Sequence, residues 1–156
     1  MRSKQDPRKG FTLIEILIVV AIIGVLSSVV LVGLRPAQQR GRDTRRIADL
    51  KEVQNALELY YQKCGFYPGN ADCTGTAGSN DYASLSAVLT SASIGVKTLP
   101  KEPNTSKTYF YSQQGGGSGY VLGATLEDAG NPALGSDIDG TFGSVSCADP
   151  TYCVEF

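Results

Sequence analysis

The chain has 156 residues, about the length of one domain, and its 14 lysines and arginines nearly balance its 15 aspartates and glutamates. This near balance gives no support for a protein that binds polyanions, so we expect no nucleic acid partner. Histidine is absent, which excludes Ser-His-Asp triads, Cys–His dyads and histidine-containing zinc or haem sites. Because no phosphate-binding loop or nucleophile motif is visible either, we expect no enzymatic activity.

Residues 1–10 are polar and basic, with four cations against the single anion Asp6. Residues 11–34 then form a continuous apolar run in which Glu15 is the only charge. As a helix this run rises by roughly 36 Å, more than the hydrocarbon core of a bilayer, which is about 30 Å thick. The alternative is a buried helix of a soluble core, but the remaining segments cannot sheathe it on every side. We therefore expect a membrane-spanning helix.

The cations before the apolar run place the N-terminus in the cytoplasm and the rest of the chain outside, although five arginines between residues 35 and 46 also follow the run. Residues 35–63 predict an amphipathic continuation of the helix, with Pro36 kinking or loosening it near the join and Gly65 suiting its stop. We expect the basic residues 40–46 to lie on a solvated face or to pair with acidic loops of other subunits. The apolar stripe is formed by residues three or four positions apart: Ile47, Leu50, Val53, Leu57 and Tyr60.

Residues 64–156 hold 14 of the 18 glycines and predict a loop-rich region with short elements. The expected fold class is α+β: one long N-terminal helix packed on a small antiparallel sheet of about three strands. Charge is segregated as well, because residues 1–63 hold 11 cations and 6 anions whereas residues 64–156 hold 3 and 9. The predicted elements are a loop at Asn70–Asn80, a short helix at Tyr82–Leu89 with Leu85, Val88 and Leu89 inward, and strands at Thr108–Ser112, Tyr120–Leu126 and Tyr152–Phe156.

The junction Lys9-Gly10-Phe11-Thr12-Leu13-Ile14-Glu15 is the most specific signal in the sequence. A general secretory signal has a shorter apolar region, and its small residues mark a cleavage site on the far side of that region. Here Gly10 precedes the run, and a carboxylate lies five residues into it. This junction resembles the class III signal of type IV prepilins and type II secretion pseudopilins, in which a basic leader and a glycine precede an aromatic residue, with glutamate at the fifth place of the mature chain.

The resemblance implies that prepilin peptidase cleaves between Gly10 and Phe11 and that Phe11 becomes N-methylated. It also implies a subunit that is first anchored in the lipid bilayer of the cytoplasmic membrane. The subunit then polymerises into a helical filament in the periplasm or on the cell surface. An assembly ATPase and an inner-membrane platform protein are the implied partners. Residues 99–103 (LPKEP) resemble the LPxDP segment of major pseudopilins with Glu102 in place of aspartate, which leaves pilin and pseudopilin both open.

Physical chemistry assigns Glu15 a role of its own. Removal of the leader exposes an ammonium group at Phe11, and Glu15 of a neighbouring subunit can pair with it among packed apolar helices. The alternative is a carboxylate near the membrane interface of a simple anchor protein, where water still reaches it. A minor pilin located at the filament tip, binding a surface, DNA or a secreted substrate, is the rival function.

All four cysteines follow the apolar run, on the side expected to leave the cytoplasm, and their even number favours disulfides. Of the three possible pairings we favour the two local ones, Cys64 with Cys73 and Cys147 with Cys153. A zinc site with four thiolates is the alternative, but the spacings are wider than those of the usual zinc knuckles.

Asp137 and Asp139 are candidate calcium ligands, with Glu127 and Asp128 as candidate additional ligands. The resemblance suggests this site, because major secretion pseudopilins carry calcium in the loop before their C-terminus, and aspartate oxygens are suitable hard ligands. Alternating aspartate and glycine is also ordinary turn chemistry. We expect no other cofactor.

Overall fold

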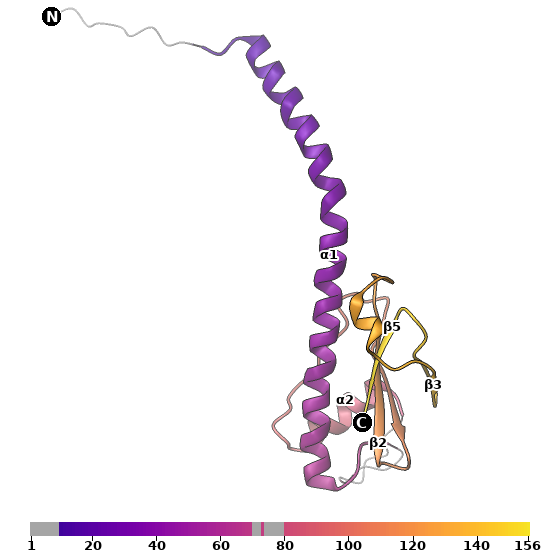
Figure 1. The fold of residues 1–156 in the computed structure, drawn as a ribbon. Helices are drawn as coiled ribbons and strands as arrows, with labels where there is room; N and C mark the ends of the chain where they lie inside the picture. Colours follow the sequence, from indigo (N-terminus) through magenta and orange to yellow (C-terminus); the bar gives the residue numbers. More distant parts are fainter. Residues whose placement is uncertain (1–9, 70–72, 74–79) are drawn as a thin grey trace, which may run out of the picture. The chain divides into compact units, whose positions relative to one another are not determined.

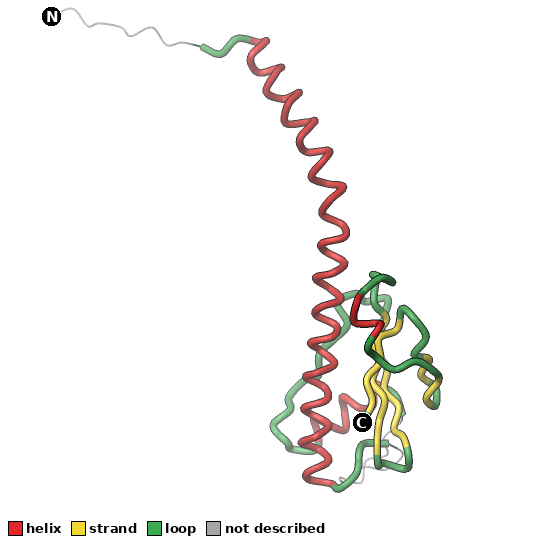
Figure 2. Tube along the Cα trace, viewed as in Figure 1, coloured by secondary structure: helices red, strands yellow, loops and turns green. Residues whose placement is uncertain are grey.

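The structure is a computed structural model that describes residues 10–69, 73 and 80–156, and of residues 29–33 the backbone alone. Predictions for residues 1–9 and for most of the 70–80 loop lie outside the described residues. The elements follow the predicted order (Figures 1 and 2). They are α1 (Leu13–Cys64), α2 (Tyr82–Ser91), β1 (Phe110–Gln114), β2 (Gly119–Thr125), the 3-10 helix η1 (Pro132–Gly135), β3 (Thr141–Phe142), β4 (Val145–Ser146) and β5 (Thr151–Glu155).

The chain divides into two compact units, Met1–Ala37 and Gln38–Phe156, and α1 runs through both. We call them the N-terminal unit and the C-terminal unit. The helix is unbroken at Pro36, so no interruption occurs where the sequence suggested loosening. At its other end, Gly65 has a φ of 77° and donates its N–H to the Tyr61 carbonyl at 2.8 Å, which is the left-handed glycine stop that the sequence predicted.

In the described part of the chain, no helix is both long enough and apolar enough to cross a membrane.

Three antiparallel strands form the main sheet of the C-terminal unit, in the order β1-β2-β5. They confirm the three predicted strands, with ends displaced by one or two residues. The sequence did not predict the separate hairpin of β3 and β4, which pairs Thr141 with Ser146 and Phe142 with Val145. Strands of two residues are too short to show the alternation by which strands are recognised in a sequence.

The main core lies between the sheet and the two helices. From α1 it takes the predicted stripe, of which Leu50, Val53, Leu57 and Tyr60 are at most 1% exposed. From α2 it takes Leu85, Val88 and Leu89, as predicted, and Asp81 caps that helix by accepting the N–H of Ser84 at 2.9 Å.

A second, smaller cluster lies on the other face of the sheet. Strand β2 alternates its side chains, so that Tyr120, Leu122 and Ala124 join the main core whereas Val121 packs against Val145, Cys147 and Cys153. The sheet is therefore the middle layer of three, with the helices on one face and the 138–147 segment on the other. In Figure 1, β3 accordingly lies on the side of the sheet away from α1.

Candidate functional site

Gly10 and Phe11, the residues on either side of the predicted cleavage point, are both exposed. Phe11 is 80% exposed, and no described atom lies within 4 Å of the position that a Cβ on Gly10 would occupy. Within the described residues, nothing covers the Gly10–Phe11 peptide bond. An enzyme that needs an extended, small residue before the cut meets no obstacle in this structure.

Glu15 forms a capping box with Thr12 at the start of α1. Its carboxylate accepts from the Thr12 N–H at 3.4 Å, and its own N–H donates to the Thr12 hydroxyl at 3.3 Å. This local role was not predicted, although the Thr-x-x-Glu spacing before an apolar run is the signature of such a box. Within the described residues Glu15 forms no ion pair. No described cation therefore compensates its charge.

Between Leu13 and Leu26 the N-terminal unit presents large apolar side chains that no described segment covers. Leu13 is 83% exposed, Val25 67% and even the least exposed of the group, Val19, 48%. An exposed apolar surface of this kind marks a site that binds lipid or protein. The other members of the group are Ile14, Ile16, Leu17, Ile18, Val20, Ile22, Ile23 and Leu26.

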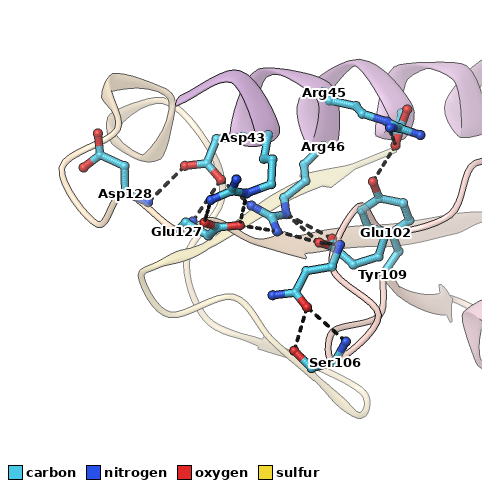
Figure 3. A network of polar contacts seen from close by, with 11 residues as sticks. Asp43, Arg45, Arg46, Glu102, Ser106, Tyr109, Glu127 and Asp128 are labelled. Atoms are coloured by element: carbon cyan, nitrogen blue, oxygen red, sulfur yellow. Dashed lines mark hydrogen bonds and ion pairs between the residues drawn. The ribbon is translucent and has the colours of Figure 1, made fainter. Parts of the chain in front are cut away.

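A network of charged side chains lies in the C-terminal unit, where α1 meets two later segments (Figure 3). At its centre Arg46 is fully buried, and its guanidinium donates to three carboxylates: Glu102 at 2.5 Å, Asp43 at 2.6 Å and Glu127 at 2.9 Å. Arg42 adds a bidentate pair with Glu127, at 2.8 and 2.5 Å. The network thus fastens the 99–103 segment and the segment after β2 to α1.

Asp43 extends the network to the backbone. It is fully buried and accepts the N–H groups of Glu127 at 2.9 Å and of Asp128 at 3.0 Å. Burial by itself would lower the pKa of Arg46, but hydrogen bonds to Glu102, Glu127 and Asp43 outweigh it and raise the pKa. The hydrogen bond from Arg42 lowers the pKa of Glu127 to about 2, against the opposing effect of burial, and Arg46 adds to the lowering. Arg46 and Glu127 are therefore charged at neutral pH.

The expectation of a solvated basic face at residues 40–46 is wrong for Arg42 and Arg46, because both bind carboxylates of their own chain. It is confirmed for Arg40 and Arg45, whose side chains are 73% and 63% exposed. The sequence held a partial signal, since Asp43 and Arg46 are three residues apart on one helix. The acidic residues that complete the network lie far away in sequence and were not predictable partners.

The structure joins the cysteines in the two local pairs favoured by the sequence. Cys147 is linked to Cys153 and Cys64 to Cys73, and no described cysteine is free. The first pair lies in the small cluster against Val121, where Cys147 and Cys153 are fully buried. The second pair closes the loop that follows α1.

Burial raises the pKa of Asp137, and the charges of Asp139 and Asp149 add to the rise. One Asp137 oxygen accepts the Cys153 N–H at 2.9 Å, whereas its buried Oδ1 has no hydrogen-bond partner among the described residues. Glu127 is not free to join as a ligand, because both of its oxygens bind arginines. Among the described residues no group of three or more His, Cys, Asp or Glu side chains is placed to hold a metal ion. Calcium at Asp137 would need backbone oxygens and water as further ligands.

Residues 6–31 match the prokaryotic N-terminal methylation motif. The chain is 36% identical over 63 residues to the type II secretion system core protein G of Escherichia coli strain K12, covering 40% of this chain and 43% of that protein. It is 36% identical over 74 residues to a fimbrial protein of Neisseria meningitidis serogroup B, covering 47% and 44%.

The type IV wide pilus major component of Thermus thermophilus is 36% identical over 92 residues, covering 59% of this chain and 57% of that protein. The chain thus spans about half the length of the curated relatives it matches, and no solved structure matches it. The methylation motif, these relatives and the long helix packed on a three-stranded sheet all agree with the resemblance to type IV pilins and type II secretion pseudopilins.

Proposed function

We propose that this chain is the structural subunit of a helical filament, either a type IV pilus-like fibre or the filament of a type II secretion system, and not an enzyme. The observation that carries the proposal is the exposed apolar helix from Leu13 to Leu26, whose only charged side chain is Glu15. Such a helix is stable in water only when other apolar groups cover it. Copies of the same helix, packed side by side, supply that cover.

Before assembly, the proposed cover is the cytoplasmic membrane. The chain would be anchored there by its apolar segment as a single pass, with the basic leader in the cytoplasm. The C-terminal unit would lie outside, which agrees with two disulfides in that unit. Prepilin peptidase, an assembly ATPase and an inner-membrane platform protein are the proposed partners in processing and extrusion.

Cleavage after Gly10 would leave a positive amine on Phe11, and methylation of that amine would keep its charge. The proposed counterion is Glu15 of a neighbouring subunit, because a buried charge is tolerated when it is paired. The contacts of Glu15 with Thr12 are long, at 3.3 to 3.5 Å, and weak hydrogen bonds of this kind are readily exchanged for an ion pair.

Processing is tested with Gly10→Leu, produced together with prepilin peptidase. A bulky side chain before the cut should leave a precursor of full mass in the membrane, as read by intact mass spectrometry. Gly24→Leu is the matched control, since it adds the same side chain within α1 at a position where a Cβ meets no described atom within 4 Å. Normal cleavage of Gly10→Leu would contradict the proposed processing site.

Assembly is tested with Glu15→Ala. This variant should be cleaved normally but should give little filament in the fraction sheared from cells, because the Phe11 amine loses its counterion. Thr12→Ala serves as the control, since it removes the capping contacts and keeps the carboxylate. Equal filament yields from Glu15→Ala and the unaltered chain would exclude the charge pair as a driving force.

Immunogold labelling separates the major subunit from the rival minor, tip-located pilin. Antibodies against the C-terminal unit should label fibres along their whole length. Labelling confined to the fibre ends would instead support the minor pilin.

Calcium binding stays a prediction, supported by the buried Oδ1 of Asp137, which accepts no hydrogen bond from the described part of the chain. If calcium binds there, added Ca²⁺ should raise the thermal midpoint of the full chain in detergent, and Asp137→Asn should abolish that rise. Asp81→Asn is the control, since Asp81 caps α2. An unchanged midpoint at millimolar Ca²⁺ would rule the site out.

A further inference from the structure

The positive and negative charges of this chain are separated along the sequence more sharply than its net charge suggests. All 14 lysines and arginines lie between residues 2 and 107. Residues 108–156 hold no lysine or arginine but six aspartates and glutamates. All of the described strands lie within these residues, so the part of the chain that forms the sheets carries only negative charges.

A basic surface lies on the helix side of the C-terminal unit. It consists of a groove of about 380 Å³, lined by residues 52–59 of α1 and by residues 95–100, and of the exposed cations Arg45, Lys97 and Lys101. Lys97 lines the groove, and Lys101 directly follows its last residue. Arg45 lies on the same face of α1 as the groove, since it precedes Glu52 by two helical turns, and its guanidinium lies 3.7 Å from Asp49. Glu52 is the one anion in the lining, and Leu59, 46% exposed, supplies an apolar patch.

An acidic surface lies on the opposite side of the sheet and is formed by the exposed carboxylates Asp139, Asp149 and Glu155. Asp139 directly follows Ile138, which packs against the small cluster, and Asp149 lies two residues after Cys147, a member of that cluster. Glu155 alternates with Cys153 along β5 and so shares its face, away from α1. Within the described residues, none of the three carboxylates forms an ion pair.

The two surfaces have opposite charge but cannot meet within one C-terminal unit, because the sheet separates them. We propose that the acidic surface of one copy docks onto the basic surface of the next copy; this inference rests on the proposed function and names the contact between C-terminal units within the filament. Complementary surfaces at different places on one molecule give a heterologous contact, which leaves one surface of each kind free at the ends and continues as an open chain. The occupant of the groove is therefore a second copy of this chain.

Charge reversal in the groove is the first test. Lys97→Glu should lower the yield of sheared filament by about tenfold, because like charges then face each other across the contact. Lys51→Glu is the matched control: it makes the same change of charge at an exposed position of α1 that does not line the groove. Equal tyrosine circular dichroism in the near ultraviolet would show that both variants are folded. Equal yields from both variants would overturn the proposal.

A charge swap is the second test. Lys97→Glu with Lys101→Glu should block assembly, as should Asp139→Lys with Asp149→Lys, whereas the two doubly changed chains mixed together should co-assemble. Failure of the mixture to recover filaments would count against this contact. In filaments of mixed light and heavy isotope-labelled copies, a carbodiimide should link Lys97 or Lys101 of one copy to Asp139 or Asp149 of another. Cross-links restricted to single copies would also overturn it.

The proposed function fails separately, if the unaltered chain forms no filament under any condition. The contact is then read from the full chain in detergent micelles at low salt. Cross-links between light and heavy copies at these lysines and aspartates would support the contact, and their absence would refute it.

Discussion

Replacing Arg46 with leucine should lower the free energy of unfolding of the C-terminal unit by about 3 to 5 kcal/mol. The Arg46 side chain is fully buried. Its removal leaves two carboxylates without their ion-pair partner: Asp43, also fully buried, and Glu102, whose side chain is 5% exposed. Both carboxylates would then lie buried without the guanidinium to which they are hydrogen-bonded. A domain of this size is stable by about 5 to 15 kcal/mol, so the loss removes a large share of its stability.

The assay is urea unfolding of the full chain in detergent, followed by tyrosine circular dichroism in the near ultraviolet. The chain has no tryptophan, and its eight tyrosines lie between residues 60 and 152, so the signal reports the C-terminal unit alone. Arg45→Leu is the matched control. Its guanidinium is 63% exposed and lies 3.7 Å from Asp49, a surface pair worth at most about 1 kcal/mol.

The reasoning is refuted if Arg46→Leu and Arg45→Leu lose the same stability. Where Arg46→Leu fails to fold, Arg46→Lys gives the graded result. It keeps the charge but not the planar fork that reaches several carboxylates, so its loss should be intermediate. The double variant Arg46→Leu with Glu102→Leu should recover part of the lost stability, because one fewer carboxylate is then buried without a partner.

Three further predictions concern the same unit. The pKa of Glu127 is about 2 in the folded chain, below its value of about 4.3 in the unfolded chain, so its charge stabilises the fold fully above about pH 4.3 and progressively less as the pH falls toward 2. In urea titrations, Glu127→Gln should therefore be less stable than the unaltered chain at pH 7 but equally stable near pH 2. A stability difference that does not change with pH would contradict this. Replacing both Cys147 and Cys153 with serine should cost roughly 2 to 3 kcal/mol in the same titration, because the unfolded chain regains the freedom of a closed loop, and an unchanged midpoint would exclude that contribution. Gly119→Ala should destabilise by about 1 to 3 kcal/mol, since its Cβ would lie 2.3 Å from the Phe156 carbonyl oxygen, whereas Gly135→Ala meets no described atom within 4 Å and should be near neutral.

Much of the fold could be predicted because it depends on local patterns. The helical periodicity between Ile47 and Tyr60 indicated the buried face of α1, and the glycine-rich turn after Gln114 separated two strands. The pairs among the four cysteines were favoured by short spacing alone. Where elements were missed, as with β3 and β4, they were too short to carry a pattern and are held by contacts with Val121 and the disulfide beneath them.

The candidate assembly features also follow from the sequence alone, since Gly10, Phe11 and Glu15 form a contiguous signal beside an apolar run. Only the tertiary structure determined which charged side chains pair with one another. Arg46 looks in the sequence like a solvated helix residue, yet Glu102 and Glu127 meet it from segments 56 and 81 residues away. Composition likewise shows a basic first half and an acidic second half, but it cannot say that the sheet holds the two charged surfaces apart. Local patterns determine which elements form, whereas the pairing of distant charges depends on how those elements pack.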